Sequence, residues 1–154
     1  MKLTTDNKSF ELKIRSYQFP YIRDDEYDSN WLNIKIKVKG LQKPWEVTNP
    51  MLLTFEVKQL AEWLEYLLEN KRNETELEFL EPNLKFVKIK KTNDKVHIRI
   101  YFELEARPIW AHSNIAGQED LYLDLILTRE GIRKAIADLK NQLKKFPIRG
   151  KIKK

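Results

Sequence analysis

The 154-residue sequence contains no cysteine, only four glycines and six prolines, and no apolar run close to the ~18 residues that a membrane-spanning helix needs. Without cysteine, the chain forms no disulfide or thiolate metal site and has no cysteine nucleophile. Its first residues also lack the apolar segment of a secretory signal peptide. From these absences we expect a cytoplasmic protein that does not insert into a membrane.

Apolar residues are plentiful by contrast. The composition is 42% hydrophobic and 11% aromatic, which is enough for one core, and the length fits one domain. The net charge is +6, but seven of the 29 bases lie from Lys140 onward, where there is no acid. The remaining 22 bases nearly balance the 23 acids, so the net charge is weak evidence for a basic binding face.

Alternation of apolar and polar residues predicts most of the strands. The expected strands are 10–17, 31–39, a short one at 45–47, 76–80, 84–92, 95–105 and 119–127. The turn at 92–95 makes 84–105 a hairpin, and in its second strand we expect Leu104 to face the core. Residues 18–30 and 106–118 are expected to be loops.

Apolar residues at helical spacing predict two helices. The first spans about 55–70, with Thr54 as its N-cap and a stripe made by Leu60, Trp63, Leu64, Leu67 and Leu68. Thr128 caps the second, whose stripe is Ile132, Ala135, Ile136, Leu139 and Leu143, and Pro147 ends it.

The predicted fold class is therefore α+β, in the order βββ-α-ββββ-α. About six to seven strands form a mostly antiparallel β-sheet, and the two helices pack on one face of it. We expect residues 1–147 to form a single domain and residues 148–154 a basic disordered tail.

Two histidines limit the enzymatic hypotheses. His97 occupies an outward strand position, which is typical of a surface residue. His112 lies beside Trp110 in the second loop, near Glu119 and Asp120, and a loop histidine near carboxylates suits general acid–base chemistry. No catalytic motif supplies a partner for it, so binding or structural use is favoured over a small hydrolase.

The acidic run Asp24, Asp25, Glu26 and Asp28 allows three interpretations: a cation site, a solvated loop, or a surface that binds protein. It does not match an EF-hand, because Ser29 stands where that loop requires glycine. Glu103 and Glu105 would share one face of a strand, as a glycosidase pair might require, but strand alternation explains them better.

A nucleic-acid-binding face is the alternative to a protein-binding one. Outward lysines and arginine interleaved with Trp31 and Tyr101 have the composition of a single-strand binding surface. They are Lys35, Lys37, Lys39, Lys85, Lys88, Lys90, Lys91 and Arg99. Any one-sided sheet also exposes charged residues to water, so this pattern alone does not decide.

Several segments, taken together, carry a family resemblance over about residues 10–147. They are Tyr17-Gln18-Phe19-Pro20, Asp25 to Leu32, Pro50 to Val57, Trp63-Leu64, Phe79 to Leu84, Phe102 to Glu105, Arg107-Pro108, Leu121 to Leu125 and Phe146-Pro147. With these segments the chain resembles the WapI-type immunity proteins, small cytosolic partners of bacterial contact-dependent toxins.

This resemblance implies inhibition by binding. The protein would occlude the toxin's C-terminal domain, which is a tRNA-cutting nuclease in the namesake system, and would catalyse nothing and need no cofactor. We expect the contact surface in the two loops, because loops on a rigid sheet commonly carry function. Its candidate residues are Asp24, Asp25, Glu26, Asp28, Trp31, Trp110 and His112. The sequence leaves open whether the protein is a monomer or a homodimer.

Overall fold

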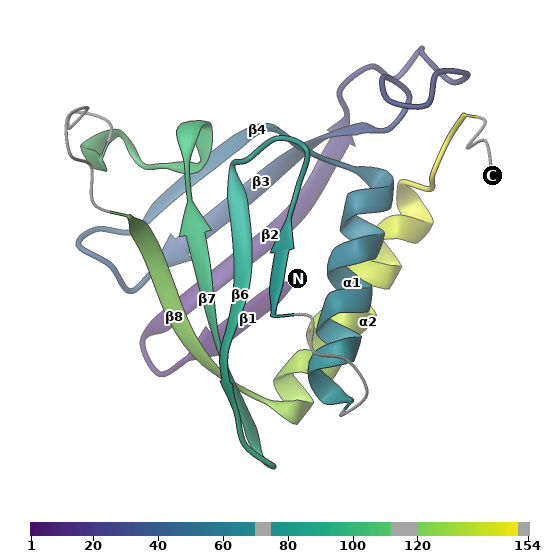
Figure 1. Cartoon of the computed structure of the whole chain (residues 1–154). Helices are drawn as coiled ribbons and strands as arrows, with labels where there is room; N and C mark the ends of the chain where they lie inside the picture. Colours follow the sequence, from purple (N-terminus) through teal and green to yellow (C-terminus); the bar gives the residue numbers. More distant parts are fainter. Residues whose placement is uncertain (70–74, 112–119, 151–154) are drawn as a thin grey trace.

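The computed structural model describes residues 1–69, 75–111 and 120–150, and this part of the chain contains eight strands and two α-helices (Figure 1). The first antiparallel sheet has the order β1-β2-β3-β4, formed by Lys2–Thr5, Lys8–Tyr17, Trp31–Lys39 and Trp45–Leu53. The second has the order β5-β6-β7-β8, formed by Glu76–Glu78, Leu84–Lys91, Lys95–Phe102 and Leu121–Thr128. The predicted α+β class is confirmed, with one more strand than expected and two sheets in place of one.

Strand β1 escaped prediction because it is short and only one of its side chains, Leu3, is buried. A two-residue turn joins it to β2, and Asp6 in that turn has a φ of 50°. Aspartate tolerates this left-handed conformation better than most residues. The turn therefore returns the chain directly into β2.

Two strand ends also differ from the prediction. Strand β4 continues to Leu53 and includes Pro50, which is tolerated because β4 lies at the edge of its sheet. Strand β7 stops at Phe102, because the chain turns into a short 3₁₀ helix, η1 (Leu104–Ala106), and Arg107 Nε donates to the Phe102 carbonyl at 3.0 Å. Leu104, expected in the core, is 53% exposed, so that prediction was wrong.

Helix α1 spans Thr54–Leu68 and α2 spans Arg129–Lys145. Thr128 caps α2 as predicted, accepting a hydrogen bond from Gly131 N at 3.0 Å. Thr54 is not the N-cap of α1: it is the first helical residue, and Leu53 holds the cap position. Glu56 instead reaches back to accept from Leu53 N at 3.1 Å, which satisfies one of the free N–H groups at the helix start.

The core lies between the two sheets and the helices. Phe10 of β2 contacts Phe86 of β6 and Phe102 of β7, with ring centroids 5.8 and 6.0 Å apart. Trp63 of α1 packs on Phe86 with ring centroids 6.0 Å apart. The inner faces of both sheets therefore point toward each other, while α1 and α2 lie side by side along one flank (Figure 1).

At two sheet edges, a side chain forms hydrogen bonds with backbone groups that no neighbouring strand reaches. Thr5 Oγ1 donates to Ile126 O at 2.8 Å and accepts from Ile126 N at 2.7 Å, so one hydroxyl links the edge of β1 to the edge of β8. The two sheets are thus joined at one side without a continuous backbone ladder.

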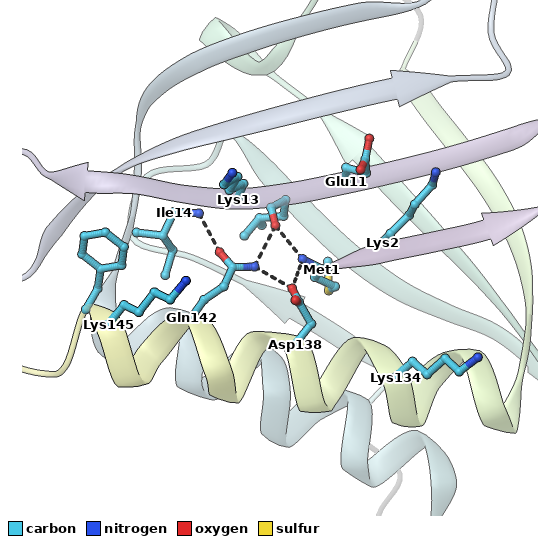
Figure 2. A pocket seen from close by; sticks show the side chains of 11 residues that line it. Met1, Lys2, Glu11, Lys13, Ile14, Lys134, Asp138, Gln142 and Lys145 are labelled. Carbon is cyan, nitrogen blue, oxygen red and sulfur yellow. Dashed lines mark hydrogen bonds and ion pairs between the residues drawn. The ribbon is translucent and has the colours of Figure 1, made fainter.

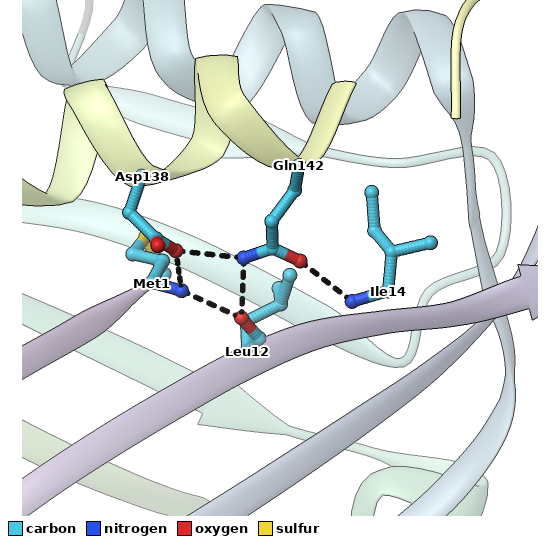
Figure 3. Close-up of polar contacts among 5 residues, drawn as sticks. All are labelled: Met1, Leu12, Ile14, Asp138 and Gln142. Atoms are coloured by element: carbon cyan, nitrogen blue, oxygen red, sulfur yellow. Dashed lines mark hydrogen bonds and ion pairs between the residues drawn. The ribbon is translucent and has the colours of Figure 1, made fainter. Parts of the chain in front are cut away.

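Gln142 of α2 does the same for β2. A cavity of about 500 Å³ lies between β2 and α2 (Figure 2), and the amino group of Met1, Asp138 and Gln142 meet there. Gln142 Oε1 accepts from Ile14 N at 2.7 Å and its Nε2 donates to Leu12 O at 3.1 Å (Figure 3). Strand β1 begins at Lys2, opposite Glu11, and does not extend along the rest of β2. The Gln142 amide therefore pairs with the free edge of β2 as another peptide group would.

We expect Gln142→Ala to lower the free energy of unfolding by about 1–3 kcal/mol, because Ile14 N loses its acceptor and Leu12 O keeps only the Met1 amine as a donor. Urea denaturation monitored by tryptophan fluorescence measures this. Asn141→Ala is the matched control, since Asn141 is exposed on the same helix. Equal stability of the two variants would show that the Gln142 hydrogen bonds contribute nothing.

Candidate functional site

The acidic loop is the segment 19–30, which contains Asp24, Asp25, Glu26 and Asp28. All four acidic side chains are exposed, but Asp25 also shapes the loop: its Oδ1 accepts from Tyr27 N at 2.9 Å and from Asp28 N at 2.7 Å. Asp25 N in turn donates to Ser29 Oγ at 2.8 Å. Asp24, Glu26 and Asp28 form no ion pair with the described residues, so their charges face solvent.

Asn30, at the end of the acidic loop, is fully buried and holds three parts of the chain together. Its side-chain oxygen accepts from Thr54 Oγ1 at 2.7 Å and from Arg149 N at 2.8 Å. Its amide nitrogen donates to Glu26 O and Arg149 O, each at 2.7 Å. Both polar atoms of the side chain are therefore paired, and the loop is tied to α1 and to the segment after α2.

Arg149 clamps the acidic loop from outside. Its guanidinium donates to the backbone oxygens of Ser29, Pro20 and Phe19 at 2.9, 3.0 and 3.1 Å, and it lies 3.5 Å from the centre of the Tyr17 ring. A planar guanidinium suits both kinds of contact. Arg149 was expected in a disordered tail, but these contacts hold it against the acidic loop. Residues 151–154 of that tail lie outside the described residues.

The next residue, Gly150, lies where the chain passes close to the acidic loop, and this position favours a glycine. Its φ is 81°, and a Cβ at this position would lie 2.7 Å from the Asp25 carbonyl oxygen. A larger residue would meet both backbone strain and a clash. The close approach keeps Arg149 in reach of the loop.

The candidate residues fall into two regions rather than one. Trp31, half-buried, begins β3 next to the acidic loop. Trp110 lies in η2 (Ile109–Ala111) and packs on Trp45 with ring centroids 5.8 Å apart, and Trp45 pairs with Val38 at the far end of β3. Val38 lies seven positions after Trp31 along the strand, a distance of about 23 Å. Figure 1 shows the two regions toward opposite ends of β3. His112 lies outside the described residues.

The hypothesised acid pair is already engaged. Arg107 donates to both carboxylate oxygens of Glu103 at 3.2 Å, and Asn83 donates to Glu105 at 3.0 Å. Since β7 ends at Phe102, the two glutamates are not on one face of a strand as expected. Among residues 1–69, 75–111 and 120–150, no group of acids and histidines has an arrangement that would hold a metal.

His97 belongs to an ionic cluster across β7 and β8. Its Nε2 lies 3.2 Å from Asp124 Oδ1, and Arg99 binds the same carboxylate at 2.8 and 3.1 Å. Burial opposes ionisation of Asp124, but the hydrogen bonds from Arg99, with the His97 imidazole close to the same carboxylate, outweigh it and lower the pKa of Asp124. These contacts account for His97 as a surface residue.

The structure divides the lysines of the hypothetical nucleic-acid face between two sheets. Lys35 and Lys37 lie on the outer face of the first sheet, where Glu46 approaches them at 3.8 and 3.7 Å. Lys85 lies on the outer face of the second sheet, 3.5 and 3.4 Å from Glu76 and Glu78. Because the inner faces point toward each other, these outer faces point apart and do not form one basic surface.

Three residues that position the candidate site or its surroundings were not among the residues predicted from the sequence: Asn30, Arg149 and Glu56. Glu56 is 4% exposed, and besides Leu53 N it accepts from Leu80 N at 2.8 Å; its burial raises its pKa. The only sequence signal for Asn30 was its place directly before Trp31, in a segment that carried the resemblance. Arg149 gave none, because it stands among other bases.

A family model for the immunity protein WapI-like family matches residues 2–147, and the chain belongs to this family. Its role is therefore that of an immunity protein, which neutralises a toxin. No curated protein matches the sequence. None of the described helices has the length and apolar character required to cross a bilayer.

We expect Arg149→Lys to loosen the acidic loop, because a lysine ammonium cannot contact the three loop carbonyls and stack on Tyr17 at once. Hydrogen exchange of the amides in residues 20–30 should accelerate roughly tenfold or more, the effect of losing about 1.4 kcal/mol of local stability. Arg133→Lys, at an exposed position of α2, is the control. Unchanged exchange in Arg149→Lys would contradict the clamp.

Proposed function

We propose that this protein neutralises the C-terminal domain of a bacterial toxin in the cytoplasm by stoichiometric, non-catalytic binding. The acidic loop and Trp31 form one part of the contact surface, and Trp110 with His112 forms another. Family membership supports the toxin-neutralising role. The geometry of the acidic loop supports recognition by binding.

The proposal rests on one observation: the backbone of the acidic loop is held in place by hydrogen bonds, while three of its carboxylates face solvent. Asn30 and Arg149 hold the acidic loop through part-buried hydrogen bonds, while Asp24, Glu26 and Asp28 remain exposed. A loop that is ordered before binding loses less conformational entropy when a partner docks. Unpaired carboxylates on such a loop steer a basic partner toward it. A basic nucleic-acid-binding groove, as in a tRNA nuclease, has the complementary charge.

The separation of the two regions is compatible with one partner. A standard protein interface covers roughly 800 Å² on each side, and is therefore roughly 30 Å across. The span between the two ends of β3 fits within this width. The acidic loop would then contribute mainly to the association rate, and the tryptophans, as large buried anchors, mainly to the lifetime of the complex.

Inhibition of the toxin should be complete at one equivalent of this protein. The test uses a toxin domain whose growth inhibition is relieved when cells express this protein. The domain is titrated with the protein while its activity and the mass of the complex by light scattering are followed. Toxin recovered by denaturation and refolding should regain full activity, because binding alters no covalent bond. Inhibition at a small fraction of an equivalent, or permanently inactive toxin, would show catalysis instead.

Charge removal in the acidic loop should slow association. The triple variant Asp24→Asn, Glu26→Gln, Asp28→Asn keeps Asp25, which shapes the loop, and should lower the on-rate at low salt by about tenfold. The control Glu62→Gln, Asp94→Asn, Glu130→Gln changes the net charge equally on other surfaces. On-rates from surface plasmon resonance at two salt concentrations compare them. The same on-rate in both triples would remove the acidic loop from the interface.

A further inference from the structure

The free edge of β4 borders a hollow whose second wall is the segment after β7 that contains η1 and η2. The hollow has a volume of about 590 Å³. On one side it is lined by Trp45, Val47 and Asn49 of β4, and on the other by Pro108, Ile109 and Trp110, with Glu46, Glu105 and Arg107 also contributing. Ile109 is 90% exposed, so a large apolar side chain already faces solvent at its rim.

The hydrogen-bond register shows which backbone groups this edge presents. Leu12 exchanges hydrogen bonds with Met1, at 2.9 and 2.8 Å, so its backbone groups point toward β1. Strand residues alternate in direction, so Glu11 and Lys13 point toward β3. The backbone groups of their partners Lys37 and Lys35 then point back toward β2, the neighbour of β3 in the sheet.

The same alternation continues across β3. Ile34, Ile36 and Val38 must point toward β4, and they pair with Asn49, Val47 and Trp45. The backbone N–H and C=O groups of Glu46 and Thr48 therefore point away from the sheet. No described residue forms a backbone hydrogen bond with them, and Pro50, two positions on, has no N–H to present.

We propose that an extended segment of the toxin domain adds to the edge of β4 as a fifth strand, with an apolar side chain in the hollow and a basic one beside Glu105. This deepens the proposed function and rests on it. A strand edge recognises an extended backbone through hydrogen bonds, and the adjoining pocket selects the side chains.

The side-chain chemistry follows from the pairing. A toxin residue opposite Val47 places its side chain on the same side of the sheet as Val47, which is the side of the hollow. The Trp45 and Trp110 rings and Ile109 form an apolar surface for it. Glu105 is exposed and has no ion-pair partner among the described residues, whereas Arg107 is buried and bound to Glu103. The uncompensated charge is therefore negative, which suits a basic neighbour.

Thr48→Pro tests the edge directly, because it removes the outward N–H and puts a ring in the path of the added strand. Its hydrogen bonds to β3 are untouched, since Thr48 makes none there. Thr48→Ala is the matched control, which loses the same side chain and keeps the N–H. We expect the affinity for the toxin domain that this protein neutralises to fall about tenfold or more in Thr48→Pro, chiefly through faster dissociation, and less than twofold in Thr48→Ala.

Hydrogen exchange of the wild-type complex supplies an independent readout. The amides of Glu46 and Thr48 should become protected on binding, because strand addition gives them acceptors. Glu105→Gln should weaken binding several-fold at low salt and less at high salt.

If Thr48→Pro does not fold, as judged by circular dichroism, Ile109→Asp replaces it as the test variant. Its control is Leu80→Asp, which alters another exposed apolar residue, 61% accessible. Only Ile109→Asp should weaken binding.

Wild-type affinity in folded Thr48→Pro and in Ile109→Asp, or unprotected Glu46 and Thr48 amides, would overturn the added strand while leaving the proposed function intact. Edge-to-edge pairing between two copies, seen as a dimer that Thr48→Pro dissociates without loss of toxin binding, would also overturn it. Failure of the wild-type protein to bind the toxin domain would instead defeat the proposed function, and this inference with it.

Discussion

The buried side chain of Asn30 is the contact on which the surface around the acidic loop depends. An amide in the interior is stable only when both of its polar atoms have partners, since each unpaired one costs about 1–3 kcal/mol. Here those partners come from Glu26, Thr54 and Arg149. The loop, the start of α1 and the segment after α2 are therefore linked to one another through a single buried side chain.

Periodicity predicted the parts of the fold in which burial alone decides the structure. The stripes of both helices and the alternation of β3 and β7 each describe one buried face, and both helices and these strands are present. The prediction was wrong where a specific contact outweighs the pattern. Arg107 binds the carbonyl of Phe102 and ends β7 early, and the edge position of β4 accommodates Pro50. Neither contact is visible in a hydrophobic pattern.

The candidate site was only partly accessible to sequence reasoning, for a related reason. Exposed acids and loop tryptophans are conspicuous, so they were named. The residues that position them act through hydrogen bonds over a separation of 119 residues, between Asn30 and Arg149, and no local pattern encodes that distance. The division of the lysines between two sheets was equally hidden, because alternation tells which side of a strand a residue occupies but not which strands share a sheet.

The Arg149 clamp also has a consequence for protein synthesis. The ribosome makes the acidic loop early and adds Arg149 only after both sheets and α2 have been translated. A nascent chain thus carries the loop without the guanidinium that orders it. Chains shorter than this would carry the acidic loop without the hydrogen bonds that Arg149 donates to it.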